Sequence, residues 1–178
     1  NGLSALMDAS FAGHVAVVRT LLQGKVDVNA ALDNGSTALM AAAQNGHTEI
    51  AAVLLAAGAN AKAKSTSGGT ALMEAAYSGH LDIVRLLLKA GSDLDATTSA
   101  GSTALMGAAL GGHTQVVSAL LEAGANPNIK DARGWTALTN ARASANPATV
   151  RLLLGKTTDL APHERSLILG SAYLNEYY

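Results

Sequence analysis

Apolar residues recur along the chain at helical spacing, in two short runs that are separated by a glycine and followed by a polar segment. In one stretch Leu72, Ala75 and Ala76 stand at positions i, i+3 and i+4. This spacing is typical of one buried helical face. The second run has the same spacing, at Val84, Leu87 and Leu88. The pattern therefore predicts two consecutive helices, each with one apolar face.

Polar and small residues mark where these two helices begin and end. Thr70 can cap the first helix, because its hydroxyl can accept a hydrogen bond from an amide of the first turn. Gly79 and Gly91 can end the two helices, since glycine adopts the left-handed conformation at little steric cost. Residues 92–102 are rich in Ser, Thr, Asp and Gly, which predicts a projecting loop. The expected unit is helix, tight turn, helix and finger.

This unit recurs with a period of 33 residues. The methionines stand at positions 7, 40, 73 and 106, and four of the five histidines stand at 14, 47, 80 and 113. A fixed period of this length is the signature of a solenoid of stacked supersecondary units. In such a stack each unit buries a face on its neighbours, which suits a chain that is 49% hydrophobic but only 3% aromatic.

The repeated unit resembles the ankyrin repeat. That family's unit carries a Gly-x-Thr-Pro-Leu-His-x-Ala-Ala phrase, a Gly-His turn, a Leu-Leu run and a Gly-Ala-Asp-x-Asn loop, and matching residues cover about 2–160. The resemblance implies an all-α solenoid of stacked helix-turn-helix units with projecting β-turn fingers. Two departures stand out: alanine replaces the proline of the phrase, and Met40, Met73 and Met106 replace its histidine. We therefore expect a more purely apolar seam between repeats.

We predict a single repeat domain over residues 1–178. Repeats are expected at about 1–30, 31–63, 64–96, 97–129 and 130–160, with a divergent capping half-repeat at 161–178. Lys25 stands where glycine ends the later helices, and Asn146-Pro147 replaces the His-Thr of the fifth turn. Asparagine caps well and proline suits the first helical position, so that helix should still form. The chain starts inside a repeat, so we expect a trimmed or processed fragment.

Charge and composition argue against several classes of function. The net charge is −1, from 12 basic and 13 acidic residues, and gives no basic footprint for nucleic acid. The chain has no cysteine, which excludes disulfides and leaves the redox compartment open. A cytoplasmic location is favoured over secretion. The longest uncharged apolar stretch, roughly residues 50–61, is too short to span a bilayer, so no membrane insertion is expected.

No group of residues predicts a catalytic or metal site. Stacked helices lie about 8–10 Å apart, whereas a zinc ion needs nitrogen ligands at about 2 Å, so the repeated histidines cannot share a metal. Each is expected to pack against its own turn. Glu74, Tyr77 and His80 could suggest acid–base chemistry, but His80 follows the helix-ending Gly79 and no nucleophile accompanies them. We expect a non-enzymatic protein without a cofactor.

At three positions of the repeat the amino acid changes from one repeat to the next, while neighbouring positions keep the same residue. One helical position holds Phe11, Gln44, Tyr77, Leu110 and Ala143. A second holds Asp8, Ala41, Glu74, Gly107 and Asn140, and the finger position after the glycine holds Ser36, Gly69, Ser102 and Trp135. The resemblance implies that these positions line the concave groove and the finger tips, where partners dock. Packing is not expected to constrain them, yet several are large and apolar, as binding anchors often are.

We therefore expect a protein–protein interaction module. Its predicted partner-binding residues are Asp8, Phe11, Gln44, Glu74, Tyr77, Leu110 and Trp135. Isolated exposed apolar residues are also common without any function, and Trp135 could instead cover the end of the stack. The alternative function is a structural spacer or self-assembly domain of a larger multidomain protein. A monomer is expected, in which Tyr173, Tyr177 and Tyr178 close the stack or support weak self-association.

Overall fold

The computed structural model of this chain describes residues 2–157, with side chains from residue 5 onward. The described part is all-helical, as expected, and its one β-type contact is an isolated bridge between Ala31 and Thr37. The helices are α1 (Gly2–Ala12), α2 (Val15–Gln23), α3 (Ala38–Gln44), α4 (Thr48–Ala56), α5 (Ala71–Ser78), α6 (Leu81–Lys89), α7 (Ala104–Leu110), α8 (Thr114–Glu122), α9 (Ala137–Ala143) and α10 (Pro147–Leu154). The predicted capping half-repeat and the terminal tyrosines lie outside the described residues.

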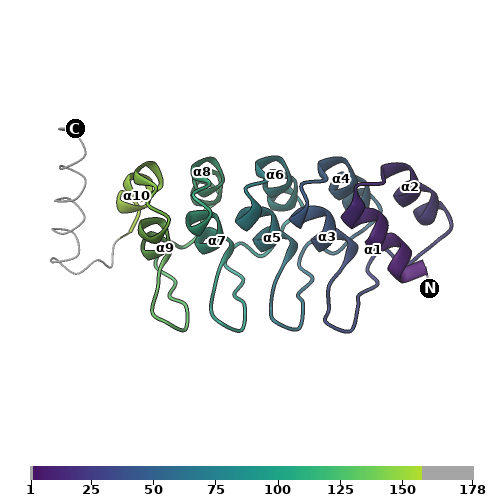
Figure 1. Cartoon of the computed structure of the whole chain (residues 1–178), viewed down its shortest axis with the longest axis horizontal. Coiled ribbons are helices and arrows are strands. Elements are labelled where there is room, and N and C mark those ends of the chain that lie inside the picture. The colour runs from purple at the N-terminus through teal and green to yellow at the C-terminus, as the bar shows by residue number, and fades with distance from the viewer. Residues whose placement is uncertain (1, 158–178) are drawn as a thin grey trace.

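The helices form two layers that run along the long axis of the molecule (Figure 1). The first helices of the pairs (α1, α3, α5, α7 and α9) form one layer, and the second helices form the other. Neighbouring first helices contact each other more extensively than neighbouring second helices do. Fully buried alanines explain this close approach, for example Ala42, Ala75 and Ala108. One helix pair falls in each predicted repeat, and the exact repeat bounds stay predictions.

Threonine begins the first helices of the second to fifth pairs, as the sequence predicts for Thr70. The Thr70 hydroxyl accepts a hydrogen bond from the amide of Met73 at 3.3 Å, and equivalent bonds form at Thr37 and Thr103. The fifth pair adds a capping box between Thr136 and Thr139. Each such bond satisfies an amide that would otherwise lack a partner at the helix terminus.

Residues in the left-handed backbone conformation follow helices at the positions that the sequence predicts. Gly79 follows α5 with φ +79°, which confirms its predicted role. Lys25 and Ala145 adopt the same conformation, with φ of 60° and 51°, although both carry a Cβ. This conformation costs a non-glycine residue about 1–2 kcal/mol. Asn146 nevertheless starts α10 as predicted, because its side chain accepts from the amide of Thr149 at 3.1 Å and Pro147 follows at the first helical position.

The core has no single centre. The largest fully buried side chains are spread along the stack: Leu6, Leu39, Ile50, Leu54, Leu72, Ile83, Leu87, Leu105, Leu120, Leu138 and Leu153. Each of the five helix pairs contributes at least one of them. Stability in such an array is approximately a sum of repeat and nearest-neighbour interface contributions.

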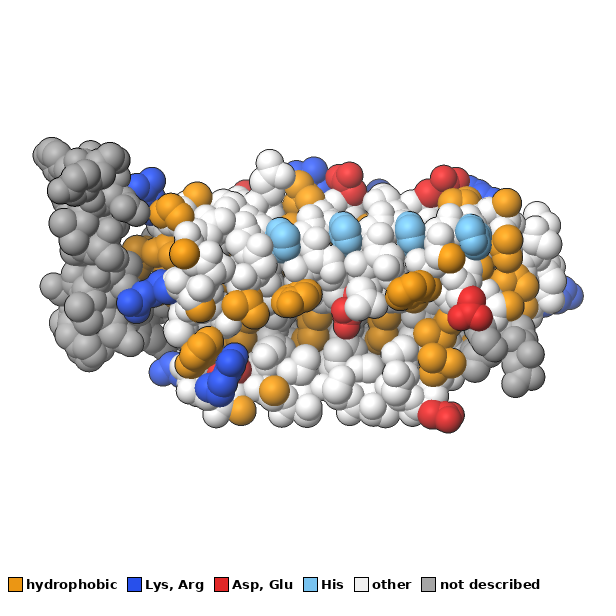
Figure 2. Space-filling view, viewed as in Figure 1, with side chains coloured by type: hydrophobic (Ala, Val, Ile, Leu, Met, Phe, Trp, Pro, Cys, Tyr) orange, Lys and Arg blue, Asp and Glu red, His pale blue; other side chains and the backbone are white. Residues whose placement is uncertain are grey.

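The Gly-His turns join each repeat to the one before it. The His113 Nε2–H donates to the carbonyl of Tyr77 at 3.0 Å, and His47 and His80 make the same contact with Phe11 and Gln44. The expectation that each ring packs against its own turn is therefore incomplete. The His113 ring does lie against Gly111 of its own turn, but it also lies over Gly79, the turn glycine of the preceding repeat, which leaves room because it has no side chain. Figure 2 shows the histidines in a row along the stack.

Neighbouring fingers are also joined, by backbone hydrogen bonds. The amide of Ser99 donates to the carbonyl of Ser67 at 2.8 Å, and Thr66 and Ala132 make equivalent bonds to the fingers that precede them. The three methionines that replace the family histidine are buried, as expected. The seam is nevertheless not purely apolar, because these backbone bonds and the histidine bonds run alongside them.

Candidate partner-binding groove

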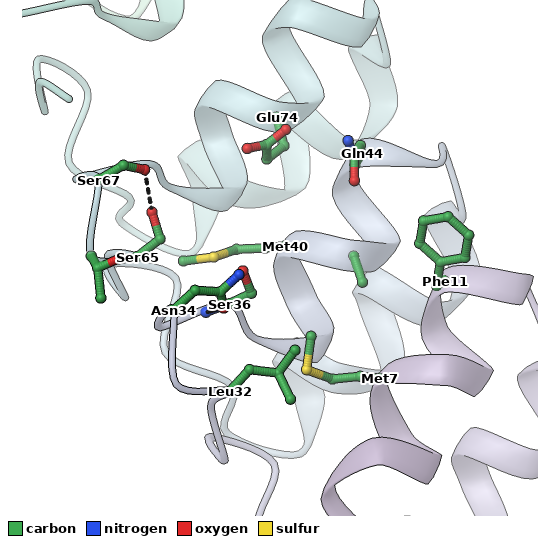
Figure 3. A pocket seen from close by; sticks show the side chains of 12 residues that line it. Met7, Phe11, Leu32, Asn34, Ser36, Met40, Gln44, Ser65, Ser67 and Glu74 are labelled. Atoms are coloured by element: carbon green, nitrogen blue, oxygen red, sulfur yellow. Dashed lines mark hydrogen bonds between the residues drawn. The ribbon is translucent and has the colours of Figure 1, made fainter. Parts of the chain in front are cut away.

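The first helices and the fingers form two walls of a groove, which contains two adjoining hollows of about 310 Å³ each. The first hollow lies over α1 and α3 and is closed on the finger side by residues 65–67. Figure 3 shows Phe11 and Met7 at one side of this hollow and Glu74 and Ser67 at the other. The second hollow lies over α5 and α7. Its helical lining includes Met73, Tyr77, Met106, Gly107 and Leu110.

Five of the predicted partner-binding residues line these hollows. Phe11 and Gln44 line the first, Tyr77 and Leu110 line the second, and Glu74 lines both. Asp8 and Trp135 line neither.

Three of the lining residues are large, apolar and open to solvent. Phe11 is 57% exposed, Tyr77 58% and Leu110 43%. They are three of the five large hydrophobic residues exposed in the described part of the chain, the others being Val17 and Leu32. Such a concentration on one side of the molecule marks a candidate interaction surface.

Trp135 lines neither hollow. Its ring centroid lies 4.1 Å, a cation–π distance, from the guanidinium of Arg133, which lines the second hollow. Asp131 holds both neighbours in place, because its carboxylate accepts from the Arg133 side chain at 2.7 Å and from the Trp135 amide at 2.8 Å. Trp135 is half-buried and serves the last described finger.

The hydrogen bonds to Asp131 also determine its ionisation. Desolvation opposes the charge, but the bonds from the Arg133 side chain and from the amides of Trp135 and Arg133 outweigh it and lower the pKa of Asp131. The carboxylate is therefore ionised at neutral pH and compensates the charge of Arg133, which lines the second hollow.

Asn140 and Leu32 differ from what the sequence pattern predicts. Asn140 was expected to be free of packing, yet it is 3% exposed and donates to the carbonyl of Thr136 at 3.0 Å. Leu32 was not predicted to belong to the site, yet it lines the first hollow and is 40% exposed. A signal was present, because Ser65, Thr98 and Asp131 are the polar residues at the matching finger position.

Among the described residues, no three His, Asp and Glu side chains come together in a group that could hold a metal ion. His80 does not face Glu74 and Tyr77, since its ring contacts the carbonyl of Gln44 on the preceding repeat. The longest of the ten described helices, α1, has 11 residues, and none of the ten could span a membrane.

Stacked helix pairs, linked fingers and an open groove define the chain as a helical repeat protein that presents a surface. A sequence model of the ankyrin repeat family, described as three copies of the repeat, matches residues 6–98 and 90–162. The chain belongs to the ankyrin repeat family, whose members are generally protein–protein interaction modules. A comparison with curated proteins finds no significant match.

Glu74 is a charged residue of the groove that is half-buried and makes no hydrogen bond or ion pair with another of the described residues. Burial raises the pKa of Glu74 above its ordinary value of 4.5. The folded chain therefore binds the proton more tightly than the unfolded chain, so ionised Glu74 destabilises the fold.

We expect Glu74→Gln to increase the free energy of unfolding at pH 7. The gain should be largest above the folded pKa of Glu74 and should vanish below about pH 4, where the carboxyl is protonated in both states. Urea denaturation of both proteins at pH 7 and pH 4 measures this difference. Asp82→Asn, at an exposed position on α6, controls for the loss of a negative charge. A gain that is the same at both pH values would contradict the assignment.

Proposed function

We propose that the chain is a non-enzymatic protein–protein interaction module whose partner docks into the groove between the first helices and the fingers. The observation that carries this proposal is the exposure of Phe11, Tyr77 and Leu110 at two adjoining hollows. Burial of such side chains gains about 25 cal/mol per Å² of apolar surface, and aromatic residues often contribute the largest share of binding energy.

The groove has the rigidity that such binding requires. Its helical wall is packed through buried alanines, and its fingers are joined to one another by backbone hydrogen bonds. A partner therefore meets a surface whose backbone is already in place, and binding needs little rearrangement. The loss of conformational entropy on binding is correspondingly small.

The triple variant Phe11→Ala, Tyr77→Ala and Leu110→Ala tests the proposal. Affinity capture from a lysate of the source cell, with wild type and variant side by side, would identify by mass spectrometry the proteins that depend on the groove. For such a protein, isothermal titration calorimetry is expected to show binding about 100-fold weaker for the variant, because three exposed anchors are lost.

Val17→Ala is the matched control for this experiment. Val17 is 46% exposed on α2 and lines neither hollow, so its substitution should leave binding unchanged. Circular dichroism should show the same helix content for all three proteins. If wild type and triple variant capture the same proteins in equal amounts, the groove is not the binding surface, and the structural spacer becomes the better hypothesis.

A further inference from the structure

Glu74 occupies the boundary between the two hollows. It projects from α5 and, together with Ser67 of the neighbouring finger, lines both. In Figure 3 its carboxylate lies across the first hollow from Phe11. A partner segment that placed one side chain in each hollow would therefore have to pass over this carboxylate.

Glu74 also carries the uncompensated charge of the two hollows. The other charged residue that lines them is Arg133, and its guanidinium is already bonded to Asp131 at 2.7 Å. No cation of the described chain pairs with Glu74, since the ion pairs there are Arg19–Glu49, Lys64–Asp93 and Arg133–Asp131. A half-buried carboxylate without a partner lowers the stability of the fold, and an incoming cation would recover that loss.

Asp8 adds negative charge on α1, near Phe11 of the first hollow. It precedes Phe11 by three residues on α1, so the two side chains share a helical face. Asp8 is exposed and forms no ion pair with another described residue. The first hollow has no basic residue in its lining. The charge around the hollows is therefore complementary to a basic segment.

We propose that the groove binds a protein segment in which a lysine or arginine, flanked on each side by a large apolar residue, pairs with Glu74. This inference rests on the proposed function, because it names the partner chemistry of the same groove. The apolar residues enter the two hollows beside Phe11 and beside Tyr77 and Leu110. The cation forms a charge-assisted hydrogen bond with the Glu74 carboxylate, which is stronger than a bond between neutral groups.

The repeat geometry sets the spacing of these three residues. The first hollow lies over α1 and α3 and the second over α5 and α7, so their centres are two helix steps apart. Packed helices are separated by about 8–10 Å. The apolar anchors should therefore lie about 16–20 Å apart, which an extended chain spans in about five or six residues. Each hollow, at about 310 Å³, is at the lower end of small-molecule pocket sizes and suits individual side chains better than a helix.

A displayed library of random 12-residue peptides tests this inference with a defined probe. Selection against the wild type is expected to enrich peptides with a basic residue about midway between two large apolar residues. Selection against Glu74→Gln should retain the apolar preference and lose the basic one. A synthetic peptide from the wild-type selection should bind Glu74→Gln about tenfold more weakly, and its affinity for the wild type should fall as salt is added.

Asp82→Asn again provides the matched control, because it makes the same carboxylate-to-amide change outside the groove. It should leave the peptide affinity unchanged. Peptides that require Tyr77 and Leu110 but have no basic preference, or that bind Glu74→Gln as tightly as the wild type, would overturn this inference and leave the proposed function standing. If no enriched peptide requires Phe11, Tyr77 or Leu110, both proposals fail.

Discussion

Leu87→Ala is expected to lower the free energy of unfolding by about 2–5 kcal/mol, as large-to-small substitutions in packed cores do. Leu87 is fully buried on α6, the second helix of the central pair. This helix contacts α4 on one side and α8 on the other, so the cavity would weaken two interfaces between repeats. Urea denaturation followed by circular dichroism measures the loss.

Leu110→Ala is the matched control for this prediction. It removes the same atoms from a side chain that is 43% exposed at the groove, so it should change the stability by less than about 1 kcal/mol. Because the stack is held by nearest-neighbour contacts, Leu87→Ala is also expected to broaden the transition as the repeats uncouple. Equal losses for the two variants would show that Leu87 is not a core residue.

Gly79→Ala is expected to cost about 3 kcal/mol, through two separate effects. The first is backbone strain, since Gly79 has φ +79° and a left-handed conformation costs a non-glycine residue about 1–2 kcal/mol. The second is a clash, because a Cβ at Gly79 would lie 2.5 Å from Nδ1 of His113. The ring would have to move and would lose its hydrogen bond to the carbonyl of Tyr77. Chemical denaturation measures the total.

Gly91→Ala separates the two effects. Gly91 has the same φ of +79°, but a Cβ there would meet no atom within 4 Å, so only the strain remains. A double-mutant cycle with His113→Ala provides a second check. Without the ring, Gly79→Ala should cost no more than Gly91→Ala does. If Gly79→Ala costs the same with and without His113, the imidazole does not link the repeats.

The pairing of a turn glycine with the next repeat's histidine also bears on the groove. His113 bonds to the backbone carbonyl of Tyr77, and His47 bonds to that of Phe11. The next repeat therefore holds in place the last turns of α1 and α5, which carry two of the proposed anchors. Weakening the seam should therefore disturb the groove as well as the fold. This link explains why a mutation outside the hollows, such as Gly79→Ala, is expected to weaken partner binding too.

The helices, their caps and their turns follow from residues that lie close together in the chain. As caps and helix ends, Thr70, Gly79 and Asn146 act through atoms of their own turn, so the local sequence predicts these roles. The 33-residue period extends these predictions to every unit, and it predicts which positions the repeat leaves free. Phe11 and Tyr77 stand at one of these free positions, and both are exposed in the structure.

Which of the free positions lie together depends on contacts between repeats. Trp135 is stacked on Arg133, Asn140 is buried, and Leu32 joins the first hollow from a finger. The histidine rings reach carbonyls 36 residues earlier in the chain. Glu74 lies between two hollows only because α3 and α7 flank its helix. These outcomes depend on packing between one repeat and the next, and a pattern read within one repeat carries no information about that packing.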